Sequence, residues 1–207
     1  MSYDEETLKY ITTCNLPTPW ATFQLHAFVD TTGKEHLAIT LGVLNNFETI
    51  LIRIHSECLT GDAMFSQRCD CGAQLETALK KIALENKGVL FYLRQEGRGI
   101  GLINKLRAYK LQDEGADTVE ANQKLGFADD QRNYKNLKSM FDHFGINKVR
   151  LMTNNPNKVA ALKEFGVTVV ERISILVNRN PFNNHYLNTK AKKLGHFIMT
   201  HKNKNFS

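Results

Sequence analysis

The order of helix-like and strand-like segments in the last two thirds of the chain is the feature that most constrains its fold. Leu75, Leu79 and Ile82 recur at helical spacing, and an apolar run typical of a buried strand follows them. Helices that alternate with strands in this way favour an α/β core with partly parallel strands. The predicted helices cover residues 73–88, 102–115, 129–145 and 156–166, and the predicted strands cover 89–95, 149–153 and 167–175.

The first third of the chain predicts antiparallel strands. Residues 21–30 and 35–43 are strand-like, and the turn-like TTGK between them favours a hairpin. Residues 48–57 form a third strand-like stretch that leads directly into a cysteine-rich segment. We therefore expect an α/β fold with a mixed β-sheet flanked by helices and antiparallel in its N-terminal part. A chain of 207 residues is expected to form one domain, residues 1–207.

Composition and charge limit where in the cell the protein is expected and which partners it is expected to bind. The acidic N-terminus lacks the apolar run of a signal peptide, and the longest apolar run, residues 37–44, is too short to cross a bilayer. The sequence thus predicts a cytoplasmic protein with no membrane partner. A net charge of +6 favours an anionic partner, which leaves nucleic acids and phosphorylated small molecules as candidates. Because basic patches interleaved with aromatic residues are not evident, we expect no nucleic-acid partner.

Three of the four cysteines, Cys58, Cys69 and Cys71, stand close together in the pattern C-x10-C-x-C. In a reducing compartment such a cluster favours a metal site or catalysis over disulfides. Three thiolates leave one tetrahedral position of a zinc ion open for water, as in catalytic zinc sites. Two alternatives remain at this point: a closed structural site completed by Cys14 or His55, and isolated buried thiols without metal.

The stretch EGRGIG, residues 96–101, lies between a predicted strand and a predicted helix. Its glycines would let a ligand approach the backbone closely, and helix N-termini attract anions. Glu96 could accept hydrogen bonds from guanine, and Arg98 could fork onto phosphate oxygens. A plain tight turn, with both charges paired at the surface, is the competing interpretation.

Two further segments carry candidate anion-binding or catalytic residues. Lys158 falls in the first turn of the helix capped by Asn155, where a cation is unfavourable unless an anion binds there. Asp129 and Asp130 precede Arg132, and one of the two carboxylates could accept a proton beside this arginine. A solvated lysine and a simple helix-capping aspartate are the alternatives.

These segments together resemble the GTP cyclohydrolase II family of riboflavin biosynthesis. The resemblance covers about residues 15–197 and leaves a flexible basic tail, residues 198–207. It rests on several long stretches in the same order, which are NLPTPWATF, RIHSECLTGDAMFSQRCDCG, RQEGRGIGLINKLRAYKLQDEGADTVEAN, FADDQR, RLMTNNPNKV and NRNPFNNHYLNTKAKKLGH.

The resemblance implies a role for individual residues. Cys58, Cys69 and Cys71 would bind a catalytic zinc ion. Asp130 would accept a proton, Arg132 is the family's proposed nucleophile, and a tyrosine at the position of Tyr109 is associated with catalysis. The implied GTP-binding residues are Arg53, Ile54, His55, Ser56, Glu57, Gln74, Glu96, Gly97, Arg98, Thr118, Thr153 and Lys158.

The implied reaction opens the imidazole ring of GTP after zinc-activated water adds at C8, and it releases formate and pyrophosphate. Mg²⁺ would accompany the phosphates, and family members are typically homodimers. A protonated guanidinium is a poor nucleophile, so stabilisation of charge on the α-phosphate is an equally good role for Arg132. A nucleotide-binding protein without turnover and a structural-zinc protein that binds nucleic acid are the competing functions.

Overall fold

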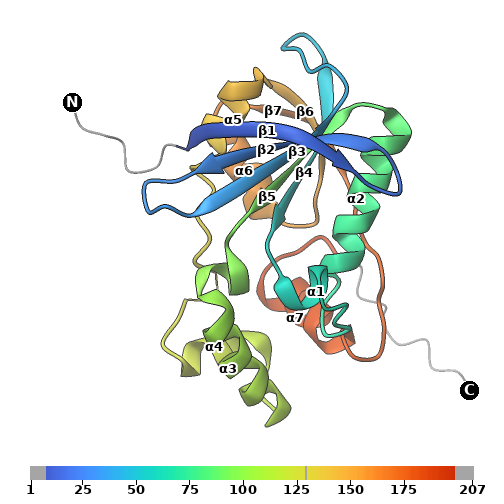
Figure 1. Cartoon of the computed structure of the whole chain (residues 1–207). Coiled ribbons are helices and arrows are strands. Elements are labelled where there is room, and N and C mark those ends of the chain that lie inside the picture. Colours follow the sequence, from blue (N-terminus) through green and yellow to red (C-terminus); the bar gives the residue numbers. More distant parts are fainter. Residues whose placement is uncertain (1–7, 129, 199–207) are drawn as a thin grey trace, which may run out of the picture.

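A single seven-stranded sheet organises the computed structural model, which describes residues 8–128 and 130–198. The strand order is β1-β2-β3-β5-β4-β6-β7 (Figure 1). The first three strands and β5 pair antiparallel, whereas β5, β4, β6 and β7 run parallel. The mixed α/β sheet predicted from the sequence is therefore confirmed. The strands are β1 Lys9–Pro17, β2 Thr22–Val29, β3 Glu35–Leu41, β4 Thr49–Ser56, β5 Gly88–Leu93, β6 Lys148–Met152 and β7 Thr168–Ile173.

Helices cover both faces of the sheet. The helix α2 supplies Ala78, Leu79 and Ile82 to one core, and α5 and α6 pack on the opposite core around β4 and β5. Burial on both faces explains why β5 is a continuous apolar run. The helices are α1 Leu59–Asp62, α2 Cys71–Glu85, α3 Gly101–Asp113, α4 Thr118–Lys124, α5 Leu137–Phe144, α6 Pro156–Glu164 and α7 Asn184–Lys193, with a 3₁₀ turn η1 at Glu96–Gly99.

Local signals explain where several helices begin and end. Asn155 caps α6 by accepting a hydrogen bond from the Asn157 backbone at 2.9 Å, with proline at the first helical position. The helix α5 ends at Gly145, whose φ of 64° suits a residue without a side chain. A capping box between Asp117 and Glu120 starts α4, a helix that the sequence analysis did not predict.

The structure differs from the sequence-based expectations at residues 129–145 and at the N-terminal edge of the sheet. The predicted helix 129–145 is wrong in its first half, because α5 begins only at Leu137 and residues 130–134 are non-helical. Asp130 uses its carboxylate on Arg132 rather than on a helix N-terminus, while Asp129 lies outside the described residues. Strand β1, at residues 9–17, was not predicted. The expected tail lies outside the described residues apart from Ile198.

The strand order reverses around β4, which lies between β5 and β6. The chain segments that leave the carboxyl ends of β4 and β5 diverge toward opposite faces of the sheet. Ligands of open α/β sheets bind in the crevice that such a divergence creates. Figure 1 shows α1, α3, α4 and α7 below these strand ends.

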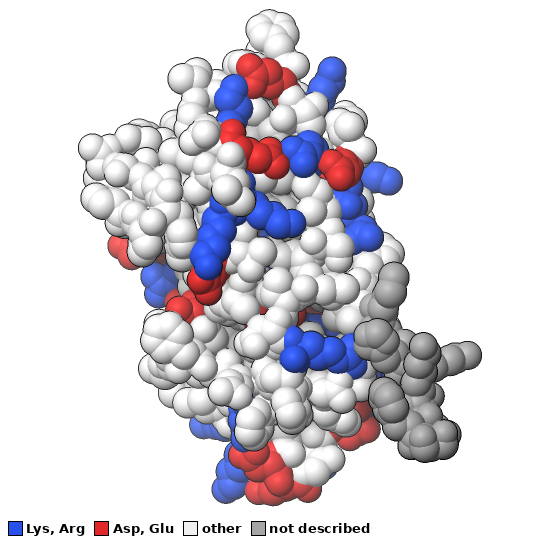
Figure 2. Space-filling model, turned by 90° about the vertical axis from the view of Figure 1, so that its right-hand side faces the viewer, with Lys and Arg blue, Asp and Glu red and all other residues white. Residues whose placement is uncertain are grey.

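The distribution of charge on the outer surface does not indicate a binding site. Basic and acidic side chains are interspersed on the face shown in Figure 2. Within residues 8–128 and 130–198, every helix falls short of the length and apolarity that a membrane crossing needs.

Candidate active site

A pocket opens at the carboxyl ends of β4, β5 and β6. It receives side chains from residues that are distant in sequence, including the cysteine segment, the glycine turn and the start of α6. Most of the residues implied by the family resemblance line it, namely Arg53, His55, Ser56, Glu57, Cys58, Cys69, Cys71, Gln74, Glu96, Gly97, Arg98, Tyr109, Thr118, Arg132, Thr153 and Lys158.

Two of the implied residues do not line the pocket. Ile54 is fully buried in the core beneath α5 and α6, because alternate residues of β4 point to opposite faces of the sheet. Only its backbone carbonyl reaches the site, where it accepts a hydrogen bond from Lys158 Nζ at 2.7 Å. Asp130 lies behind Arg132, which does line the pocket.

The three clustered thiols converge at one point. The sulfur atoms of Cys58, Cys69 and Cys71 all lie within 4.8 Å of one another, and the first two are 3.7 Å apart. Two thiolates bound to one tetrahedral zinc at about 2.3 Å are about 3.8 Å apart, so the spacing fits zinc. The backbone of Gly61 closes this cradle, since a Cβ there would lie 2.8 Å from Cys69 Sγ and 3.2 Å from Cys58 Sγ.

The alternatives of a closed zinc site find no support in the geometry. Within the described residues, the potential ligand group contains these three cysteines and no fourth protein ligand. Cys14 is exposed on β1, opposite Leu25 of β2. His55 is likewise outside this ligand group, and its Nε2 lies 3.0 Å from Asp62 Oδ1. An open three-thiolate arrangement therefore fits the cluster best.

Asp62, which the sequence analysis did not single out, orders the residues around the first cysteine. Its carboxylate meets His55 and accepts hydrogen bonds from the Tyr92 hydroxyl at 2.8 Å and the Cys58 backbone at 3.0 Å. Burial lowers the pKa of His55, even though Asp62 opposes the shift, so the imidazole is neutral at pH 7. The carboxylate thus fixes both a pocket side chain and the backbone of Cys58.

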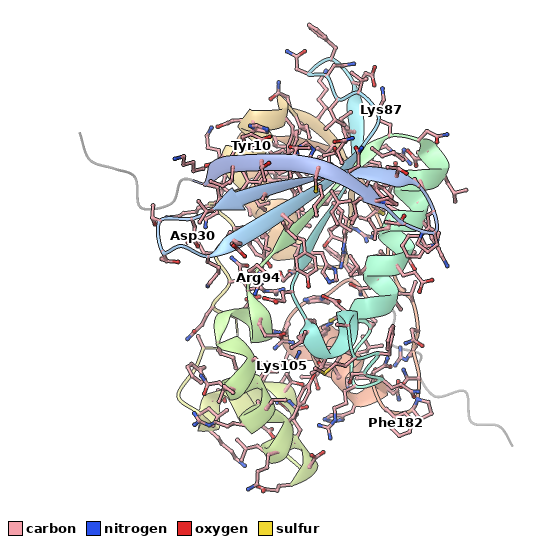
Figure 3. All side chains as sticks on the ribbon, viewed as in Figure 1. Tyr10, Asp30, Lys87, Arg94, Lys105 and Phe182 are labelled. Carbon is pink, nitrogen blue, oxygen red and sulfur yellow. The ribbon has the colours of Figure 1, made fainter. Side chains whose placement is uncertain are left out.

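Lys105 of α3 connects the thiol cluster to the glycine turn. Its Nζ lies 3.1 Å from Cys58 Sγ and 2.8 Å from Glu96 Oε1, and Figure 3 shows it between α3 and the cysteine segment. Glu96 also accepts hydrogen bonds from the backbones of Leu59, at 2.7 Å, and Gly97, at 2.8 Å. A guanine bound at Glu96 would therefore share this carboxylate with three protein donors.

The glycine turn has an unusual backbone that presents Arg98 to the pocket. Arg98 has a φ of 61°, a left-handed conformation that is strained for a residue with a side chain. Its carbonyl accepts a hydrogen bond from the Gln131 backbone at 3.0 Å, and a Cβ at Gly99 would lie 3.0 Å from the Gln131 carbonyl oxygen. This close approach places Arg98 and Arg132 at the same pocket.

Asp130 and Arg132 form a bidentate pair. Arg132 donates from Nε at 2.8 Å and from a terminal nitrogen at 2.5 Å. Burial acts to raise the pKa of Asp130, but the bonds to Arg132 outweigh it and lower the pKa. For Arg132, burial acts to lower the pKa, but the same bonds raise it. Both groups are consequently charged at neutral pH.

Positive charge dominates the remainder of the pocket. Arg53 is 4% exposed and donates to the Met152 carbonyl at 2.9 Å and to Gln74 Oε1 at 2.5 Å. Burial and the neighbouring arginines lower the pKa of Lys158. Arg53 Nε, both terminal nitrogens of Arg98 and Asn155 Nδ2 are buried donors without a hydrogen-bond partner among the described residues. Such donors fit an anionic ligand.

Tyr109 lies on the α3 side of the pocket, next to the cysteine segment. Its hydroxyl is 3.5 Å from Thr60 Oγ1, and the Arg68 guanidinium lies 4.9 Å from its ring centre. Burial raises the pKa of Tyr109 to about 12, so the phenol is a proton donor at neutral pH.

The sequence did not predict several other residues that line the pocket. Asp70 stands between two of the cysteines and accepts from Gln74 at 2.5 Å. Lys105 lies on a helix with a mixed pattern, and Tyr186 and Lys190 lie on the short α7. The sequence stretches that resemble the family contain these residues, which was the one indication of a role in the site. No local pattern distinguishes them from surface residues.

Comparison with known proteins agrees with this geometry. A sequence model of the GTP cyclohydrolase II family matches residues 9–174. The GTP cyclohydrolase-2 of Hahella chejuensis is 58% identical over 95% of this chain and 96% of its own length. That of Saccharophagus degradans is 59% identical over 93% of this chain and 96% of its own length.

A solved structure of a two-domain 3,4-dihydroxy-2-butanone 4-phosphate synthase from A. baumannii aligns over 84% of this chain and 42% of its own, with 16% identity and a TM-score of 0.45. This likeness is too weak to support a conclusion. The family match and the curated relatives extend along most of the chain, and the pocket joins a three-thiol cluster to unpartnered cationic donors. The chain belongs to the GTP cyclohydrolase II family.

Proposed function

We propose that this chain hydrolyses GTP to formate, pyrophosphate and 2,5-diamino-6-(5-phospho-D-ribosylamino)pyrimidin-4(3H)-one, the first step of riboflavin biosynthesis. One observation carries the proposal: a cluster of three thiols and a cluster of cations line the same pocket. The reaction needs both, because it opens a ring by hydrolysis and also cleaves a phosphoanhydride.

Cys58, Cys69 and Cys71 would hold zinc, which would supply the Lewis acidity that hydrolysis of the guanine ring requires. Around the metal, Lys105 neutralises part of the thiolate charge and Asp62 fixes the backbone of the first cysteine. Mg²⁺ bound to the triphosphate would offset phosphate charge that the protein cations leave uncompensated.

Arg53, Arg98 and Lys158 are proposed to bind the phosphates, since their donors face the pocket from three different elements. Arg132 is proposed to stabilise charge that develops on the α-phosphate, because its pairing with Asp130 keeps the guanidinium protonated. A protonated guanidinium cannot attack phosphorus, so a covalent role would require Arg132 to give up a proton first, for which its paired carboxylate, Asp130, is the acceptor at hand.

Asp130 is proposed to accept the proton released by the water that attacks the α-phosphate, after substrate draws Arg132 toward the phosphate. Tyr109 is proposed to donate a hydrogen bond near the metal, which its high pKa permits. The resemblance further supports one domain, a homodimer and a cytoplasmic location, and light scattering of the purified protein tests the dimer.

The deciding experiment incubates zinc-loaded protein with GTP and Mg²⁺ and measures formate and pyrophosphate. We expect both products in equal amounts. Cys69→Ser should lose zinc and formate release, whereas Cys14→Ser, which changes the exposed thiol of β1, should keep both activities. Absence of both products from the zinc-loaded wild type would refute the proposal.

A further inference from the structure

The stretch that follows the region matched by the family model, residues 175–198, returns to the pocket; we call it the C-terminal segment. Asn154, two residues after the end of β6, holds both ends of this segment. The Asn154 side chain forms hydrogen bonds of 2.8 and 3.1 Å with the backbone of Ile175. The backbone carbonyl of Asn154 accepts a hydrogen bond from the Phe197 backbone at 2.9 Å. The segment is thereby tied into a closed loop at the carboxyl end of the sheet.

The helix α7 forms the inner part of this loop and lies below the carboxyl end of β4 (Figure 1). Tyr186 and Lys190, one turn apart, line the pocket. The Lys190 side chain is only 12% exposed, and its Nζ lies 3.2 Å from Asp70 Oδ1 and 4.2 Å from the Tyr186 ring centre. An ammonium group held in this way faces the pocket rather than solvent.

The same tyrosine ring also faces the glycine turn. The Arg98 guanidinium lies 5.9 Å from the Tyr186 ring centre, and both of its terminal nitrogens are buried without a partner in the described part of the chain. Tyr186 therefore separates two cations, Arg98 and Lys190, which come from different ends of the sequence.

The balance of charge at this place favours an anion. Arg132 and Lys158 add to the positive potential that Arg98 and Lys190 create around His196. Burial first, and then these cations, lower the pKa of His196 to about 3, so the imidazole is neutral. The facing carboxylates, Asp70 and Asp130, are each already engaged by hydrogen bonds.

We propose that the C-terminal segment is part of the nucleotide site and that Lys190 binds the triphosphate together with Arg98, with the Tyr186 ring holding the two cations apart. The inference rests on the proposed function for the identity of the nucleotide. The chemistry it requires is more general, since any polyphosphate chain would satisfy the two cations.

The test compares Lys190→Gln with Lys192→Gln in the zinc-loaded, full-length protein. Lys192 is exposed on the same helix and provides a matched loss of one positive charge. Calorimetry would measure binding of guanosine and of the Mg²⁺ complex of inorganic tripolyphosphate, and steady-state kinetics would measure KM and kcat for GTP.

We expect Lys190→Gln to weaken tripolyphosphate binding and to raise the KM for GTP by about ten-fold or more, with guanosine binding unchanged. Lys192→Gln should change each quantity by less than about two-fold, and Lys190→Arg should restore most of the tripolyphosphate affinity. Equal affinity of Lys190→Gln and Lys192→Gln for tripolyphosphate would overturn the inference. Equal weakening of guanosine and tripolyphosphate would also overturn it, because Lys190 would then only hold Asp70 in place.

The two proposals fail in different ways. A wild-type protein that binds tripolyphosphate through Lys190 but produces neither formate nor pyrophosphate would refute the proposed function and leave the inference standing. If the wild-type protein turns over GTP and Lys190→Gln changes neither its kinetics nor its tripolyphosphate affinity, the inference is refuted and the proposed function stands.

Discussion

Replacing Gly61 with alanine tests the geometry of the metal cradle. Gly61 lies in α1 among the three cysteines, and its backbone has an ordinary helical conformation, so alanine is allowed there. The new Cβ would lie 2.8 Å from Cys69 Sγ and 3.2 Å from Cys58 Sγ, whereas ordinary contacts begin at 3.4 Å. At least one sulfur must therefore move by about half an ångström.

The consequence for metal binding follows from that displacement. Zinc–sulfur distances in a good site vary by only about 0.2 Å, so the sulfurs cannot yield without loss of coordination geometry. We expect zinc affinity to fall about 10- to 100-fold, or about 1.4 to 2.7 kcal/mol. The metal-free protein should not lose stability comparably, because alanine in a helix is favoured over glycine by about 1 kcal/mol.

The assay is competition for zinc between the protein and a chromogenic chelator, with thermal unfolding of metal-free protein as a control. Gly61→Ser, which is larger, should bind zinc more weakly than Gly61→Ala. Unchanged zinc affinity in both variants, with the fold intact, would refute the assignment of the metal to this cradle.

Three further predictions concern the acidic pair, the core and the tyrosine. Asp130→Asn should lower the free energy of unfolding by about 3 kcal/mol, because it leaves the buried charge of Arg132 unpaired; urea denaturation checks this. Since Arg132 lowers the pKa of Asp130 below 3.8, the difference from wild type should be full above that pH and be lost as the pH falls through the lowered pKa; a constant difference from pH 7 to pH 2 would contradict the pairing. Ile54→Val should cost about 1 kcal/mol of stability while kcat and KM for GTP stay unchanged, whereas a several-fold rise in KM would mean that its side chain contacts substrate. Because burial raises the pKa of Tyr109 to about 12, Tyr109→Phe should lower kcat without altering the shape of the pH–rate profile between pH 7 and 9.5, and a wild-type ionisation in that range that disappears in the variant would argue against this.

The central part of the fold could be predicted because its signals are local. Strand-like stretches and helical spacing predicted β4, β5, β6 and the helices α2 and α3, and the resulting order implies parallel pairing. Strand β1 was missed because most of its residues are exposed, and its antiparallel pairing with β2 depends on a contact that no local pattern reveals.

The false start of the helix at residues 129–145 has a specific physical cause. Tyr134 and Leu137 are both buried, so the apolar spacing continues through a segment that is not helical. Bonds from Arg132 to Asp130, and from Gln131 to the glycine turn, fix the backbone there instead. Tertiary contacts thus override the helical periodicity.

The cysteine cluster was predictable because three thiols in one short segment have few plausible uses, and the structure brings them together. Local sequence did not distinguish Asp62, Lys105 and Lys190, since each lies in an ordinary-looking segment and acquires its environment from distant parts of the chain. Side chains of this kind become recognisable only when the fold supplies their partners.

The alternation of side chains along β4 couples core stability to substrate specificity, two properties that protein engineers usually vary separately. Ile52 and Ile54 fill the core on one face, while Arg53 and His55, the intervening residue and the next, line the pocket. A substitution that changes this core by much more than the single methyl group lost in Ile54→Val shifts the backbone that positions both polar side chains. Selection for thermostability at β4 should therefore alter substrate specificity as a by-product, and libraries intended to vary one property alone should leave this strand unchanged.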